Sequence, residues 1–125
     1  VGLPAERARW NAARADRAQF AGARALCAEV RARTEPNAVI FAPNAGAVGI
    51  RLPYLCGREF NYFPEPGYGM SDYRRMKAEA RDPRAFARGV ADRAGPRPVY
   101  FATRGSWGGR EVASAGGWRL YEVAP

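Results

Sequence analysis

The fold is limited most strongly by a short, uninterrupted apolar segment, residues 38–42 (Ala-Val-Ile-Phe-Ala). Residues 35–37 (Glu-Pro-Asn) precede it and Pro43-Asn44 follow it, and both flanks break regular structure. A strand buried on both faces is a continuous apolar run, whereas a strand with one face in water alternates apolar and polar residues. A second such run, residues 99–102, occurs late in the chain. The two runs predict buried strands of a parallel sheet.

A long helix is predicted ahead of the first strand, over residues 5–33. This stretch is rich in alanine, the strongest helix former. Its second half carries apolar residues at helical spacing, with Leu26 at the edge of the face formed by Phe20, Ala23, Cys27 and Val30. That face predicts where the helix packs on the rest of the molecule.

The remaining pattern completes an α/β order. The predicted elements are a helix over 45–55, a strand over 59–63, helices over 72–80 and 82–93, and strands over 97–103 and 118–123. Residues 64–69 and the glycine-rich residues 105–109 are predicted loops. We therefore expect one α/β domain over residues 1–125: a long N-terminal helix and a small, mostly parallel sheet of about four strands covered by helices, with the last strand at an edge.

The first half of the long helix is less clearly patterned. Trp10 lies off the apolar face, and Arg7, Arg14, Arg17 and Arg24 run along the flank beside it. One interpretation is an amphipathic helix whose first turns are in water. The other is a helix that leaves a membrane, with Trp10 and the arginines near the lipid headgroups.

Histidine is absent, which removes the most common general base and the most common zinc ligand. A Ser-His-Asp or Cys-His mechanism within this chain is therefore excluded. We predict no catalytic residue, no metal site and no cofactor.

The chain is strongly basic, with 20 Lys and Arg against 12 Asp and Glu, and Lys77 is its one lysine. A basic domain attracts phosphate-rich partners such as lipid headgroups or nucleic acid. Here the basic residues are spread along the chain and interleaved with acids, so nucleic acid is not the expected partner.

Two cysteines, Cys27 and Cys56, stand outside any Cys-x-x-Cys motif, which argues against zinc and thioredoxin-like chemistry. In an oxidising compartment they can form a disulfide. The alternative is a pair of buried free thiols that pack as small apolar side chains.

Aromatic residues gather around the two predicted loops. Tyr62, Tyr68 and Tyr73 lie in or beside the first loop and Trp107 lies in the second, and Arg58 follows Gly57 near the start of the predicted strand. Loops on a rigid sheet commonly carry binding sites. These five residues, Arg58 included, are our candidates for contact with a carbohydrate, a peptide or another small ligand.

Several short motifs occur in a familiar order. They are residues 30–34 (VRART), 35–41 (EPNAVIF), 54–58 (YLCGR), 99–101 (VYF) and 118–123 (WRLYEV). Over residues 22–123 this series resembles the C-terminal extracytoplasmic domain of bacterial GT-C membrane glycosyltransferases. That group includes dolichyl-phosphate-mannose–protein mannosyltransferase-like and lipid A aminoarabinose transferase-like proteins.

The resemblance implies that the catalytic acids and the polyprenyl-phosphate sugar donor belong to membrane-embedded segments of a larger protein. It implies no catalytic residue in this chain, and a location on the periplasmic or cell-surface side of the inner membrane, where a Cys27–Cys56 disulfide can form. A start without Met fits the same expectation. The expected partner is the membrane-embedded part of the same polypeptide, with lipid headgroups or a glycan or peptide acceptor as further partners. The alternative is a free-standing carbohydrate- or small-ligand-binding α/β module.

Overall fold

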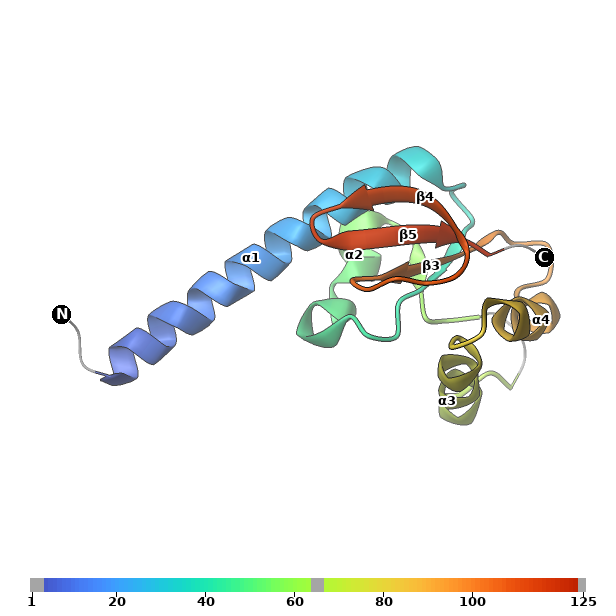
Figure 1. Ribbon diagram of the computed structural model, residues 1–125, viewed down its shortest axis with the longest axis horizontal. Coiled ribbons are helices and arrows are strands. Elements are labelled where there is room, and N and C mark those ends of the chain that lie inside the picture. The colour runs from blue at the N-terminus through green and yellow to red at the C-terminus, as the bar shows by residue number, and fades with distance from the viewer. Residues whose placement is uncertain (1–3, 64–66, 124–125) are drawn as a thin grey trace.

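The computed structural model describes residues 4–63 and 67–123, except for the side chains of residues 15 and 16. Along the chain the elements are α1 (Pro4–Arg33), β1 (Val39–Phe41), the 3₁₀ helix η1 (Gly46–Ile50), α2 (Leu52–Cys56), β2 (Glu59–Phe60), α3 (Met70–Glu79), α4 (Pro83–Ala94), β3 (Val99–Thr103), β4 (Arg110–Ala115) and β5 (Trp118–Glu122). The α/β class and the long first helix are confirmed (Figure 1).

The sheet has five strands in the order β2-β1-β3-β5-β4. β1 pairs in parallel with β2 and β3, and β5 pairs antiparallel with β3 and β4. The sheet is therefore mixed, and the prediction of a mostly parallel sheet was wrong. Gly116 and Gly117, both with positive φ, join β4 to β5 in a two-residue turn, and so short a turn can only join antiparallel strands.

The fifth strand, β4, was not predicted, and β5 lies inside the sheet rather than at its edge. β4 forms the edge and its side chains are exposed or only half-buried. A strand in that position needs no apolar run, so the sequence gives little sign of it.

Each face of the sheet has its own apolar core. On one face Ile40, Tyr100 and Leu120 pack with α1, η1 and α2, and on the other Val39, Phe41 and Phe101 pack with α3 and α4. The side chains of β1 and β3 thus alternate between two buried faces, as the continuous apolar runs predict. The result is three layers, with helices on both sides of the sheet.

Three local predictions need correction. The expected helix over 45–55 is divided into η1 and α2, with Gly46 at positive φ and Pro53 in the first turn of α2. The expected strand over 59–63 ends at Phe60, because Asn61 has a φ of 59°. The helix expected over 72–80 begins at Met70 instead. Residues 64–66 of the predicted loop lie outside the described residues.

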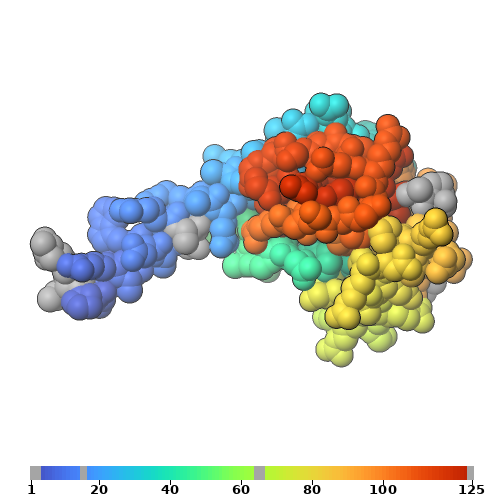
Figure 2. Space-filling model, viewed as in Figure 1, coloured from blue at the N-terminus to red at the C-terminus, as the bar shows by residue number. Residues whose placement is uncertain are grey.

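The first half of α1 projects from the body of the molecule as an arm (Figures 1 and 2). From Pro4 to Gln19 every described side chain except that of Ala13 is exposed. The second half packs as predicted, with Ala23, Leu26, Cys27 and Val30 buried. Among the described residues no helix combines the length and apolar character needed to cross a membrane.

Candidate ligand-binding pocket

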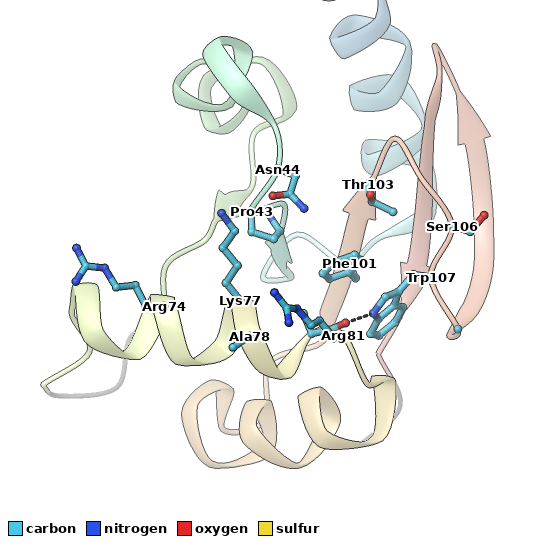
Figure 3. A pocket seen from close by; sticks show the side chains of 12 residues that line it. Pro43, Asn44, Arg74, Lys77, Ala78, Arg81, Phe101, Thr103, Ser106 and Trp107 are labelled. Atoms are coloured by element: carbon cyan, nitrogen blue, oxygen red, sulfur yellow. Dashed lines mark hydrogen bonds between the residues drawn. The ribbon is translucent and has the colours of Figure 1, made fainter.

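A pocket of about 700 Å³ opens at the carboxyl ends of β1 and β3 (Figure 3). Three segments line it: the chain after β1, the end of β3 with the loop that follows, and α3 with the residues after it. The lining residues are Pro43, Asn44, Arg74, Lys77, Ala78, Ala80, Arg81, Phe101, Thr103, Ser106, Trp107 and Gly108.

The topology places this pocket at the switch point of the sheet. After β1 the chain forms β2, which lies on one side of β1. It then forms β3, which lies on the other side of β1. The connections after neighbouring parallel strands therefore diverge, and the ends of β1 and β3 are left open between them. In open α/β sheets this crevice is where ligands bind.

Two side chains hold the segment after β1. Asn61 Oδ1 accepts a hydrogen bond of 2.7 Å from Ala42 N, and Asn61 Nδ2 donates one of 3.2 Å to Ala42 O. Tyr73 Oη donates to Pro43 O at 3.3 Å. These hydrogen bonds fix the backbone at Pro43, which forms part of the pocket rim. The sequence pattern does not single out Asn61, although asparagine tolerates the left-handed conformation that this residue adopts.

Trp107 forms an apolar wall of the pocket. Its ring stacks on Phe101 with centroids 4.6 Å apart and meets Phe86 edge-on at 5.8 Å. Its indole Nε1 donates to Ala80 O at 2.7 Å, the bond drawn in Figure 3, and its backbone N–H donates to Tyr121 Oη at 3.1 Å. A loop tryptophan held by two hydrogen bonds and by the rings of Phe86, Phe101 and Tyr121 gives the pocket a defined surface.

Among the described residues, three ionisable groups line the pocket, and all are cationic: Arg74, Lys77 and Arg81. Their spacing of three and four residues sets them along one side of α3 and its extension. No ion pair joins any of them to an acid whose side chain the structure describes. Figure 3 shows Lys77 and Arg81 directed into the pocket and Arg74 directed away from it.

Among the described residues, the pocket is lined by two side chains that carry hydroxyl groups. Its two hydroxyl groups are engaged, since Thr103 Oγ1 accepts from Gly105 N at 3.1 Å and Ser106 Oγ accepts from Arg119 Nη1 at 3.0 Å. Beside the pocket, burial raises the pKa of Tyr68 from 10.0 to about 12. Within the described part of the chain no group of three or more acids and cysteines is placed to hold a metal ion.

The structure gathers the three candidate tyrosines beside the pocket, not inside it. The rings of Tyr62 and Tyr68 lie 6.1 Å apart, edge to face, and Tyr68 Oη donates to Asn61 O. Tyr73 lies against Phe41 and supports Pro43. Of the five candidate ligand residues, only Trp107 lines the pocket.

Arg58 lies elsewhere. It precedes β2, at the amino end of the parallel strands, whereas the pocket is at their carboxyl end. Its guanidinium donates to Thr34 Oγ1 and Thr34 O at 3.1 and 3.2 Å. In this position Arg58 ties the end of α1 to β2, away from the other candidate residues.

Cys27 and Cys56 form a disulfide, with the sulfur atoms 1.98 Å apart and the Cα atoms 4.4 Å apart. The bond connects the buried face of α1 to the end of α2. Beside it Arg31 Nη1 donates to Leu55 O at 2.6 Å. These contacts fix the second half of α1 on the body and leave its first half as the arm.

No family model, curated protein or solved structure matches the chain. Its function is therefore inferred from its own residues.

Proposed function

We propose that this chain is a non-catalytic accessory domain of a multi-pass membrane glycosyltransferase that uses a polyprenyl-phosphate sugar donor. The domain lies on the extracytoplasmic side of the inner membrane, periplasmic or at the cell surface. Its partners are the membrane-embedded part of the same polypeptide and the lipid headgroups next to it.

The strongest support comes from the arm of α1, Pro4 to Gln19. At 1.5 Å per residue this segment is about 24 Å long. A helix that is exposed on all sides gains nothing from packing, and helices in water derive most of their stability from packing. The arm therefore has the character of a segment stabilised by a surface outside this chain.

The composition of the arm fits a membrane surface. The side chain of Trp10 is 64% exposed, and exposed tryptophan is typical of the membrane–water interface. Arg7, Arg9, Arg14 and Arg17 lie on the same arm and outnumber its two acids, Glu6 and Asp16. Arginines near an anionic leaflet are attracted to its phosphates.

Two further features agree with this proposal. A disulfide between Cys27 and Cys56 is compatible with an oxidising, extracytoplasmic compartment. Among the described residues, the pocket is lined by cationic, hydroxyl and apolar side chains, which are suited to binding a ligand.

Vesicle binding tests the membrane contact directly. The chain is expected to co-sediment with phosphatidylglycerol vesicles, to bind phosphatidylcholine vesicles much less, and to show tryptophan quenching by brominated lipid that is lost in Trp10→Phe. Replacing Arg7, Arg9 and Arg14 by Gln is expected to weaken binding strongly. Equal loss in the control, with the exposed Arg84, Arg88 and Arg110 replaced by Gln, would reject a role for the arm.

Activity assays test the accessory role. Deleting residues 1–125 from the intact membrane protein is expected to impair sugar transfer in isolated membranes, while the purified chain transfers none. Transfer by the purified chain alone would overturn the proposal.

A second candidate function, a free-standing carbohydrate- or small-ligand-binding module, is favoured by the pocket. The two differ in what the native gene encodes. A gene product that fractionates with the membrane and resists extraction by salt supports the accessory role, and a product released without detergent supports the free-standing module.

A further inference from the structure

We infer that the pocket at the carboxyl ends of β1 and β3 binds a small phosphorylated molecule, with its phosphate held by Lys77 and Arg81. The inference is independent of the membrane role of α1, because the arm and the pocket are formed by different elements.

The two cations approach one space from α3 and from the residues that follow it. Lys77 extends toward Pro43 and Asn44, and the guanidinium of Arg81 lies between Lys77 and Phe101 in this view, turned away from Trp107 (Figure 3). Both side chains are exposed and neither forms an ion pair with an acid of the described residues. Two unpaired cations that converge on a recess favour an anion there.

The acids of α3 do not oppose that charge. Asp72 Oδ1 lies 3.4 Å from Arg93 Nη2, and Glu79 Oε1 lies 3.9 Å from Arg75 Nε. Neither acid lines the pocket. The negative side chains of the helix are thus paired with other arginines, and its pocket side stays positive.

The carbonyl groups at the end of α3 accept hydrogen bonds within the protein. The last carbonyl groups of a helix carry partial negative charge and repel anions when they are free. Here Ala78 O accepts from Arg81 N, Glu79 O accepts from Asp82 N, and Ala80 O accepts from the Trp107 indole. These bonds occupy the carbonyl groups, so that less unpaired negative charge faces a ligand.

The rest of the pocket has room and surface for an organic group attached to the phosphate. A volume of about 700 Å³ falls within the range of sites for small organic molecules. Pro43, Phe101 and Trp107 supply apolar surface, and the amide of Asn44 supplies a donor and an acceptor. An organic group such as a sugar fits this lining while its phosphate meets the two cations.

Calorimetric titration of the 125-residue chain tests the site with defined probes. Glucose 1-phosphate is expected to bind, inorganic phosphate to bind more weakly, and glucose to give no detectable heat. Geranyl phosphate, titrated separately, distinguishes a lipid-linked phosphate from a soluble one: tighter binding than glucose 1-phosphate assigns the site to a lipid phosphate, and weaker binding to a soluble phosphate ester. Binding is expected to weaken as salt is added.

Matched variants locate the phosphate. Lys77→Gln and Arg81→Gln are each expected to weaken glucose 1-phosphate binding roughly tenfold, the effect of losing one charge-assisted contact. Arg88→Gln removes the same charge from an exposed residue of α4 outside this pocket and is expected to bind as wild type. Unchanged thermal unfolding establishes that the variants fold. Equal binding of glucose and glucose 1-phosphate, no binding of any phosphate probe, or wild-type affinity in both pocket variants would each overturn the inference.

Discussion

Gly22 of α1 and Gly116 of the β4–β5 turn lie backbone against backbone. A β-carbon on Gly22 would stand 2.6 Å from the carbonyl oxygen of Gly116, and one on Gly116 would meet the backbone of Gly22 just as closely. The absence of side chains at both positions lets α1 approach the β4–β5 hairpin closely. The contact therefore also fixes the point at which the arm projects from the rest of the molecule.

Alanine at Gly22 is therefore expected to destabilise the protein, although alanine within a helix is normally favoured over glycine by about 1 kcal/mol. The atoms in the way are backbone, so the helix must shift, and we expect a net loss of about 1–3 kcal/mol in the free energy of unfolding. Urea denaturation measures it. Gly105→Ala is the control, since its nearest atom is Thr103 Oγ1 at 3.8 Å and little change is expected. Wild-type stability in Gly22→Ala would contradict the close contact.

Removing the Cys27–Cys56 disulfide is expected to lower the free energy of unfolding by about 3–4 kcal/mol, because the bond closes a loop across a sequence separation of 29 residues. Thermal unfolding with and without reductant measures this loss. The double variant Cys27→Ala, Cys56→Ala should unfold at a lower temperature than the wild type and should not respond to reductant. A wild-type protein equally insensitive to reductant would show that the bond is absent in solution.

Asn61→Ala and Asn61→Gly separate two contributions at the rim of the pocket. Both variants lose the side-chain hydrogen bonds to Ala42, but only alanine is strained at a φ of 59°. We expect Asn61→Ala to be less stable than Asn61→Gly by about 1 kcal/mol, and both to be less stable than wild type. Equal stabilities of the two variants in urea would show that the backbone there is not held left-handed.

The stability of the protein is expected to fall in alkali as Tyr100 ionises. Burial, followed by the 2.9 Å hydrogen bond that Tyr100 Oη donates to Glu35, raises the pKa of Tyr100 from 10.0 to about 12. A raised pKa means that the folded state holds the proton more tightly, so this contribution is complete below pH 10.0 and is lost as the pH rises through about 12.

Tyr100→Phe checks this assignment. The variant should be less stable at neutral pH by about 1 kcal/mol, for the lost hydrogen bond, and its stability should fall less steeply than that of the wild type between pH 10.0 and pH 12. Urea unfolding across that range measures both effects. Tyr54→Phe, at a side chain that is 90% exposed, should change neither. Parallel curves for Tyr100→Phe and wild type would contradict the assignment.

The sequence by itself determined the parts of the fold that depend on local patterning. Residues 39–41 and 99–103 are buried strands because an uninterrupted apolar run is stable only between two covered faces. The alanine content of α1 predicts that helix. The start of α4 is predicted by Asp82, which precedes Pro83 and caps the helix by accepting a hydrogen bond from Arg84 N.

Only the tertiary structure decided which strands are neighbours and which residues meet at the site. β4 is a strand because β5 pairs with it, and β5 became internal for the same reason. Lys77 and Trp107 come from separate elements, and only the crossover from β2 to β3 brings both to one pocket. The spacing of residues along the chain does not predict such long-range contacts. The free energy that selects them comes from packing across the sheet and not from neighbours along the chain.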